Sequence, residues 1–253
     1  MKNKETAILK MLAEKESVSV AELSELLGCS AVTVRKYLAN MEKMHLLIRT
    51  HGGAARVTSK LNLMIRPGNV YQHPEEKQRI AERAYFYIEN NDTIVLDDSS
   101  IAYYLAEYIR DHNSKNMIVL TNSLAVAVLL SDLSEITLFM IGGQIGGKLP
   151  SAIGEIAMST VSGFKANKAF ISAHSINFDA GVTTIGSPQM QVKKAILDVT
   201  DDIYILADSS KFGNSYVMVF CGLDRVKKII TDSGLSKESI AMAEEKHVDI
   251  DIV

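Results

Sequence analysis

The stretch from Ser30 to Ala54 reads SAVTVRKYLANMEKMHLLIRTHGGA and decides the fold of the N-terminal part of the chain. Within it, Val34, Leu38 and Met41 recur at helical spacing, so one face of a helix packs on a core while the opposite face stays open. Ser30 suits the N-cap of this helix because its hydroxyl accepts a hydrogen bond from a free amide of the first turn. The pattern is typical of a helix that meets a partner through its polar face.

The residues before this helix predict two further helices. The segment 19–22, SVAE, has the spacing of a capping box and opens a helix through Leu27 that Gly28 ends. With a first helix over about 5–13, the result is a three-helix unit whose third helix enters a DNA major groove, and residues 46–56 predict a hairpin, or wing. The candidate DNA-binding residues are Ser30, Thr33, Arg35, Lys36 and Tyr37 on the helix and Arg49, His51 and Arg56 on the wing. Capping boxes and amphipathic helices also occur in many proteins that bind no DNA.

The distribution of charge supports this interpretation. Residues 1–57 carry nine Lys and Arg against six Asp and Glu, whereas the remainder of the 253-residue chain carries 18 against 24. A basic head joined to an acidic body fits a DNA-binding domain on a second domain that does not adhere to DNA. The positive excess is small, so it supports the helix pattern without establishing DNA binding.

Several function classes find no support in the sequence. Cys29 and Cys221 lie far apart and outside any CxxC, and the six histidines form no HExxH or similar spacing, so we expect no disulfide, metal or cofactor. No apolar run approaches about 18 residues, and the first ten residues, MKNKETAILK, lack the apolar segment of a signal peptide. We therefore expect a cytoplasmic protein with no membrane partner.

The rest of the chain predicts a second domain of α/β class. We assign a winged helix-turn-helix domain to residues 1–57, a linker to 58–73 and an effector-binding and oligomerisation domain to 74–253, with Pro74 in the first turn of a helix. Continuous apolar strands alternating with helices imply a mainly parallel sheet covered on both faces. The expected strands are 93–96, 117–120, 136–141, 169–173, 203–207, 228–230 and 248–252, and the expected helices between them are 101–111, 124–130, 155–162, 190–199 and 237–245.

Polar or glycine-containing loops follow five of these strands. Because ligands of open parallel sheets bind beyond the carboxyl ends of the strands, we expect these loops to form one pocket for a small polyol or its phosphate. The candidate effector-binding residues are Asp97, Asp98, Ser99, Ser100, Thr121, Asn122, Gly142, Gly143, His174 and Lys211. The alternative is that Ser, Asp, Asn and Gly recur here only because they cap helices and form turns.

Two groups of motifs resemble the DeoR family of bacterial transcription regulators. SAVTVRKYL followed by LIRTHGGA resembles its DNA-binding domain, and TNSL, IGG, VTT, ADSSKFG and IITD follow in the order of its effector domain. The resemblance covers nearly the whole chain. It implies a winged helix-turn-helix joined to an α/β domain similar in fold to phosphosugar isomerases, and a cytoplasmic repressor released by a sugar phosphate.

The chain departs from the family pattern at several positions. Tyr37 stands where the family has an acidic residue, so the family's site preference is not carried over. Where the family has DSGTT, residues 97–101 read DDSSI, which adds the carboxylate of Asp98. A carboxylate beside a phosphate is unfavourable by roughly 1 kcal/mol at about 4 Å in water. An unphosphorylated, cationic or otherwise substituted ligand therefore stays open.

We expect a DNA-binding transcription regulator, a repressor of a carbohydrate-utilisation operon. Its partners would be double-stranded operator DNA, a small sugar, polyol or sugar phosphate, and further copies of itself in a dimer or tetramer. One alternative is a phosphosugar isomerase-type enzyme with an accessory DNA-binding head, in which Asp97, Asp98 and Asp208 are candidate bases while Asn177 and Gln189 stand where acids are expected. A second alternative is a regulator whose effector pocket has decayed.

Overall fold

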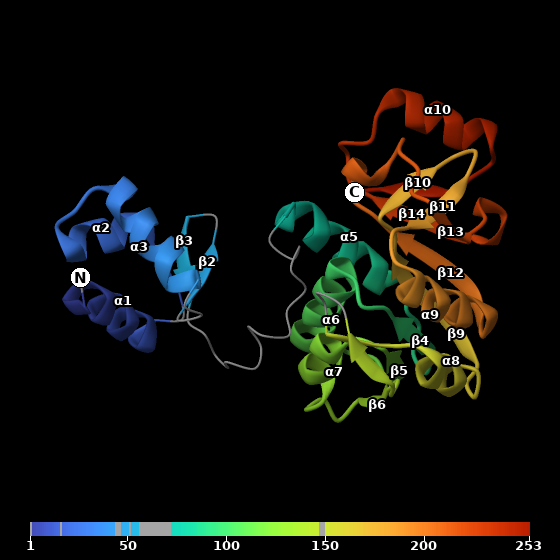
Figure 1. The fold of residues 1–253 in the computed structure, drawn as a ribbon, viewed down its shortest axis with the longest axis horizontal. Helices are drawn as coiled ribbons and strands as arrows, with labels where there is room; N and C mark the ends of the chain where they lie inside the picture. Colours follow the sequence, from blue (N-terminus) through green and yellow to red (C-terminus); the bar gives the residue numbers. More distant parts are fainter. Residues whose placement is uncertain (1, 16, 44–46, 51, 56–71, 147–149) are drawn as a thin grey trace. The chain divides into compact units, whose positions relative to one another are not determined.

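The computed structural model describes residues 2–15, 17–43, 47–50, 52–55, 72–146 and 150–253 (Figure 1). The chain divides into two compact units, Met1–Ile65 and Arg66–Val253. All but the last two residues of the predicted linker, 58–73, lie outside the described residues. Each unit is described by itself.

The smaller unit combines three helices with a small antiparallel sheet. Its elements in chain order are α1 (Lys2–Glu14), β1 (Ser17–Ser19), α2 (Val20–Leu27), α3 (Ala31–Lys43), β2 (Ile48–Thr50) and β3 (Gly53–Ala55). The predicted helices and the hairpin are confirmed, whereas β1 was not expected and completes a sheet of order β1-β3-β2. The apolar faces of the helices form one core, in which Ile8, Leu23, Val34 and Met41 are fully buried.

The predicted capping box at the start of α2 is present. The Ser19 hydroxyl accepts the amide of Glu22 at 3.2 Å, and the Glu22 carboxylate accepts the amide of Ser19 at 2.8 Å. Gly28 ends the helix with φ 58°, in the left-handed region where a residue with a side chain is strained. These two signals fix the turn that leads into α3.

The RTHGGA motif contains a glycine that the wing requires. A Cβ atom on Gly53 would lie 1.9 Å from the carbonyl oxygen of Val18, because β3 pairs with β1 at this point. The neighbouring Gly52 has open space around the same position. Gly53 is therefore required because β1 and β3 lie too close for a side chain at this position. The packing around Gly52 would accept a Cβ atom.

The larger unit is built on a seven-stranded sheet in which every pairing is parallel, in the order β15-β14-β12-β9-β4-β5-β6. The strands are β4 (Thr93–Leu96), β5 (Met117–Thr121), β6 (Ile136–Met140), β9 (Ala166–Ser172), β12 (Thr200–Leu206), β14 (Lys228–Thr231) and β15 (Ile250–Ile252). All seven predicted strands are confirmed, with ends shifted by up to three residues. Their apolar side chains are buried because helices cover both faces.

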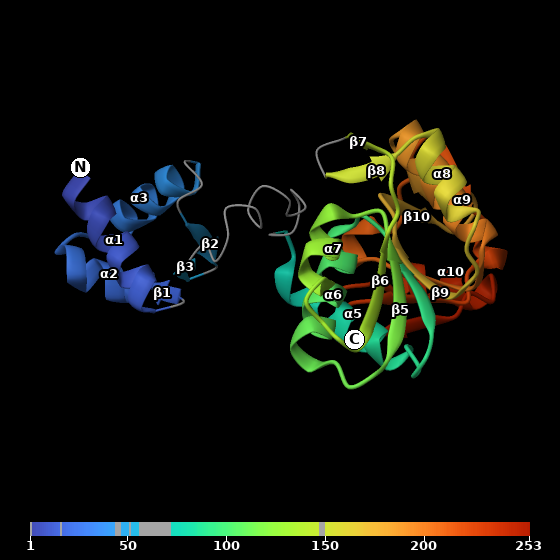
Figure 2. The same cartoon turned by 90° about the horizontal axis from the view of Figure 1, so that it is seen from below.

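One face of the sheet carries α5 (Pro74–Phe86), α6 (Ser100–His112) and α7 (Leu124–Leu130), and the other carries α8 (Glu155–Val161) and α9 (Ser187–Asp198) (Figures 1 and 2). Ser99, Ser123 and Ser236 are the N-caps of α6, α7 and α10 (Lys237–Glu245). The capping interpretation is therefore correct for the loops that follow β4 and β5, where Ser99 and Ser123 cap the next helix. This capping does not exclude a ligand, because the other free amides at the start of each helix can still donate hydrogen bonds to it.

Two small sheets were not predicted. One contains β10 (Ser175–Asn177), β11 (Gly181–Thr184) and β13 (Met218–Cys221), and the other contains β7 (Gln144–Gly146) and β8 (Ser151–Ile153). The 3-10 turns η1 (Ser209–Lys211) and η2 (Leu223–Arg225) flank β13. Strands of three or four residues carry too few side chains for an alternating pattern to stand out.

The strand order places a switch point between β4 and β9. From β4 the chain moves outward through β5 and β6, then returns with β9 on the other side of β4 and continues outward to β12 and β14. The loops after β4 and β9 consequently diverge, which opens a crevice at the carboxyl ends of the strands. This is the position where a ligand is expected in an open parallel sheet.

Candidate functional site

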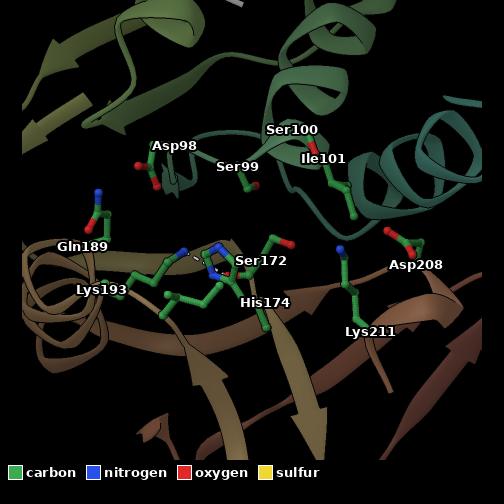
Figure 3. A pocket seen from close by; sticks show the side chains of 13 residues that line it. Asp98, Ser99, Ser100, Ile101, Ser172, His174, Gln189, Lys193, Asp208 and Lys211 are labelled. Atoms are coloured by element: carbon green, nitrogen blue, oxygen red, sulfur yellow. Dashed lines mark hydrogen bonds between the residues drawn. The ribbon is translucent and has the colours of Figure 1, made fainter. Parts of the chain in front are cut away.

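A cavity of about 430 Å³ lies at this switch point, within the range of roughly 300–1,000 Å³ typical of small-molecule sites. It is lined from four directions: by the loop after β4, the end of β9, the start of α9 and the loop after β12. The lining residues are Asp98, Ser99, Ser100, Ile101, Ser172, Ala173, His174, Ile185, Gly186, Gln189, Lys193, Asp208 and Lys211 (Figure 3).

Asp97 lies behind the wall of this cavity and is 1% exposed. One of its carboxylate oxygens accepts the amide of Ser99 at 3.0 Å, and the other accepts the amide of Ser172 at 2.9 Å and the ammonium of Lys193. Both oxygens are occupied within the protein, so this arrangement does not support the predicted contact of Asp97 with ligand hydroxyls. Its carboxylate instead ties the β4 loop to the end of β9.

Lys193 projects from α9 into the wall of the cavity and is almost fully buried. Its ammonium donates to Asp97 and, at 2.8 Å, to the carbonyl oxygen of Ser172. It also lies 5.5 Å from the ring centroid of Phe220. Because the carboxylate of Asp97 neutralises this ammonium, Lys193 organises the site without giving it a net positive charge.

Asp98 and Asp208 are the two buried carboxyl groups among the residues that line the cavity, and Asp98 lies on the side of Gln189. Burial raises the pKa of Asp98, and the nearby charge of Asp97 raises it further, while the ammonium of Lys193 and a hydrogen bond from Ser151 act in the opposite direction. Among the described residues, no lysine or arginine forms an ion pair with Asp98. This group can therefore accept a donor from a ligand.

His174 stands at the middle of the cavity, just beyond the end of β9 (Figure 3). Its Nδ1 lies 2.9 Å from the hydroxyl of Thr184, which leaves Nε2 for a ligand. Partial desolvation lowers the pKa of this imidazole, and the positive charges of Lys193 and Lys211 lower it further. At neutral pH His174 is therefore a neutral hydrogen-bonding group.

Lys211 and the N-terminus of α6, whose N-cap Ser99 directly follows Asp98, also line the cavity. Ser99 caps this 13-residue helix by accepting the amide of Ala102 at 3.1 Å, and the remaining amides of the first turn lie at the partially positive end of the helix. The loop that holds Lys211 is anchored because Ser175 donates to the carbonyl oxygen of Lys211 at 2.9 Å. An ammonium and a helix N-terminus together suit an anionic group.

Besides Asp97, four predicted residues do not line the cavity, namely Thr121, Asn122, Gly142 and Gly143. The Asn122 side-chain amide donates to the carbonyl oxygen of Ala152 at 3.2 Å, which holds β8 in place, and Thr121 accepts the amide of Ser123. A Cβ atom on Gly143 would lie 3.1 Å from that of Ala157. These residues pack or support the loops around the cavity.

Of the ten predicted effector-binding residues, the cavity brings together Asp98, Ser99, Ser100, His174 and Lys211. The predicted effector-binding set lacks Lys193 on α9, and it also lacks Gln189, which was noted only as standing where an acid is expected, because the set was drawn from the loops that follow strands. A signal was present, since Lys193 stands one helical turn before the buried Ile196 and Leu197, which predicts an inward-facing lysine. Ile185 and Gly186 offered no such signal.

The candidate DNA-binding face lies on α3. Val34, Leu38 and Met41 are buried in the core, whereas Arg35 and Lys36 are exposed on the opposite face. Ser30 caps the helix and shares a hydrogen bond of 3.0 Å with the hydroxyl of Thr33, and Tyr37 packs partly against the core. On the wing, Arg49 lies 3.6 Å from Glu42, while His51 and Arg56 lie outside the described residues.

Two family models match this arrangement. The model described as DeoR-like helix-turn-helix domain matches residues 5–60, and the model described as DeoR C terminal sensor domain matches residues 72–233. The chain belongs to the DeoR family. The second match contains every residue that lines the cavity, which makes the cavity part of the DeoR sensor domain.

Curated DeoR-family relatives match nearly the whole chain. The uncharacterized HTH-type transcriptional regulator YulB of Bacillus subtilis is 31% identical over 97% of this chain and 94% of its own length. The glycerol-3-phosphate regulon repressor of Escherichia coli is 24% identical over 97% of this chain and 96% of its own length. Ribose 5-phosphate isomerase A from Neisseria gonorrhoeae superposes with a TM-score of 0.41, at 16% identity, over 55% of this chain and 53% of that chain. The matched relatives are transcription regulators.

The described part of this DeoR-family chain lacks two further features, a metal-binding cluster and a membrane-spanning helix. No group of three or more His, Cys, Asp or Glu residues there is placed to hold a metal ion. No described helix has the length and apolar character needed to cross a membrane.

Proposed function

We propose that this protein is a cytoplasmic transcription repressor that binds operator DNA through α3 and is released by a small sugar or polyol carrying an anionic group. The observation that carries the proposal is the cavity at the switch point of the sensor domain, which is lined by Lys211, by the α6 N-terminus and by the hydrogen-bonding groups of Asp98, His174 and Gln189. An anion site facing several polar groups suits a phosphorylated polyhydroxyl compound.

The DNA-binding part of the proposal rests on the exposed face of α3. Arg35 and Lys36 provide positive charge on the face opposite the core, and the capped start of the helix carries Thr33. A single short helix reads few base pairs, so the protein would bind two half-sites as a dimer or a higher oligomer. The wing residues Arg49, His51 and Arg56 are proposed to contact the DNA backbone.

The names of two relatives support a proposal about the class of genes that this protein regulates. One relative is a repressor of the glycerol-3-phosphate regulon and another is a putative repressor of the aga operon of Escherichia coli. We infer that this protein likewise controls an operon of carbohydrate metabolism. Effector binding would change the DNA affinity by a coupling free energy of about 1–3 kcal/mol, enough for a change of roughly 5- to 150-fold.

The test measures fluorescence anisotropy of labelled DNA from upstream of the protein's own gene, at fixed salt, with phosphorylated and free sugars and polyols added in turn. We expect binding that one phosphorylated compound reverses. Lys36→Ala should weaken DNA binding, while Lys194→Ala, an exposed lysine of the sensor domain, serves as the control. If neither the protein nor its oligomers bind this DNA, the proposal is refuted.

A second variant separates the effector site from DNA binding. Lys211→Ala removes the ammonium that faces the anion site and should abolish release by the effector while leaving DNA affinity unchanged. A normal response of this variant would refute the placement of the anion at Lys211.

The isomerase alternative has one observation in its favour. Asp98 is a buried carboxyl group with a raised pKa in the cavity, as proton transfer between adjacent sugar carbons requires. Turnover of a pentose or hexose phosphate that Asp98→Asn abolishes would support an enzyme. We propose that no such turnover occurs, in keeping with relatives that are transcription regulators.

A further inference from the structure

Charge is unevenly divided between the two sides of the cavity. On the side of the β4 loop and α9, the carboxylates of Asp97 and Asp98 face a single ammonium, that of Lys193. Asp97 contacts this ammonium directly, and both of its oxygens are occupied. Burial raises the pKa of Asp98, which disfavours its charged form in the absence of a further cation. An ionised Asp98 would leave this side with one excess negative charge, so a cation bound beside it would favour the carboxylate form.

The side of the β12 loop carries the lysine that lines the cavity away from Asp98. Lys77, buried on the first turns of α5, feels the charges of Asp208, Lys211 and Glu76. The two lysines and the two carboxylates of this group balance one another in formal charge. Within the cavity itself, Lys211 supplies an ammonium on this side, and His174 between the two sides is neutral.

Figure 3 shows how the two sides are separated. Asp98, Gln189 and Lys193 lie on one side of the cavity, Lys211 and Asp208 lie on the other, and Ser172 and His174 lie between them. A ligand that spans the cavity therefore meets a cationic site at one end and an acidic site at the other. A doubly anionic or a neutral ligand would match only one of the two ends.

We propose that Asp98 is a specificity-determining residue that selects an effector carrying a protonated amine, so that the effector is an amino-substituted sugar or polyol phosphate. The inference rests on the proposed function for the anion site at Lys211. The ammonium of such an effector supplies the counter-charge that Asp98 lacks, and its N–H groups donate to the carboxylate in a charge-assisted hydrogen bond. A hydroxyl group would supply the hydrogen bond without the charge.

The neighbouring ammonium of Lys193 does not prevent this contact. Lys193 donates to Asp97 and to the carbonyl oxygen of Ser172, and its charge is balanced by Asp97. Asp98 accepts a hydrogen bond from Ser151, which lies on β8. Gln189, which lines the cavity beside Asp98, belongs to a different element. The carboxylate accepts several hydrogen bonds, so it retains capacity for a ligand.

The test compares ligands that differ only in an ammonium or a hydroxyl group. The pairs are glucosamine 6-phosphate with glucose 6-phosphate, galactosamine 6-phosphate with galactose 6-phosphate, and serinol phosphate with glycerol phosphate. Binding to the full chain is measured by titration calorimetry at pH 7, and release of DNA is measured by anisotropy. We expect at least one amine to bind about tenfold or more tightly than its hydroxyl partner.

Variants at the two ends of the cavity provide matched controls. Asp98→Asn keeps the shape and removes the charge, and Asp98→Ser supplies the residue of the DSGTT pattern; both should abolish the preference for the amine. Lys211→Gln should weaken both members of each pair by the same factor and leave their ratio unchanged. Unchanged DNA binding by each variant shows that it is folded.

Two results would overturn the proposal. The first is that no amine binds more tightly than its partner; if a hydroxyl compound still releases DNA, the proposed function stands without the amine. The second is a preference for the amine that persists in both Asp98 variants. If none of these compounds binds and no phosphorylated sugar or polyol releases DNA, both the amine and the proposed anion site fail.

Discussion

The buried ion pair between Asp97 and Lys193 gives the sharpest test of how the site is held together. Their side chains are 1% and 7% exposed, and each makes further hydrogen bonds to the backbone at the end of β9. Replacing Lys193 by Met leaves the Asp97 carboxylate buried with only the amides of Ser99 and Ser172. Replacing Asp97 by Asn leaves a buried ammonium without its counter-ion.

The expected magnitudes follow from this burial. Removing one partner of a buried pair costs about 3–5 kcal/mol in the free energy of unfolding, because the remaining charge is uncompensated. Independent effects would therefore sum to about 6–10 kcal/mol in the double variant. We expect the Asp97→Asn/Lys193→Met protein to lose only about as much as either single variant, since neither charge of the pair then remains without its partner.

The assay is urea unfolding of the four proteins, followed by the near-UV circular dichroism of the tyrosines, most of which lie in the sensor domain. The exposed pair Lys165 and Asp201 serves as the control, because pairs of that kind contribute about 0–1 kcal/mol. Losses that add within about 0.5 kcal/mol in the double variant at Asp97 and Lys193 would refute the reasoning.

Three further predictions concern other parts of the chain. Gly53→Ala should destabilise the smaller unit by about 1–3 kcal/mol or more in urea, because its Cβ would overlap the Val18 carbonyl oxygen, whereas Gly52→Ala should have little effect; equal losses would contradict the packing argument. Burial lowers the pKa of Lys77 to about 8. The unfolded chain therefore binds more protons than the folded protein above pH 8. The free energy of unfolding, measured relative to the Lys77→Met variant, should rise by up to about 3 kcal/mol between pH 7 and pH 10.5. A difference that does not change with pH would argue against a buried ammonium. Burial raises the pKa of Cys221 to about 11, so its thiol should resist a disulfide reagent at pH 8 until urea unfolds the protein, and rapid modification of the native Cys29→Ser variant would show that it is accessible.

Most of the fold was predictable because its signals are local. The apolar strands are buried on both faces, so each appears as a continuous run, and Ser19 with Glu22 marks a helix start that the structure confirms. The role of Gly53 was not predictable, since it depends on the unexpected strand β1 lying against it. A long-range approach of two backbones leaves no periodicity in the sequence.

The site was predictable in part for the same reason. A rule about strand ends finds Asp98, His174 and Lys211, because parallel strands bring their carboxyl ends to one edge. It also selects Asp97, Thr121, Asn122, Gly142 and Gly143, which lie at strand ends but face other parts of the protein. The rule cannot tell which side chains at that edge are already occupied by internal partners.

The interpretation of Asp98 changes once the internal partners of its neighbours are known. In the sequence it is an added negative charge that argues against a phosphate ligand. In the structure Asp97 is already used by Lys193, and Asp98 lies with Gln189 on the side of the cavity away from Lys211 (Figure 3). Repulsion between charges falls with their separation. A carboxylate at one end therefore does not oppose a phosphate at the other, and it favours a ligand whose far end is positively charged.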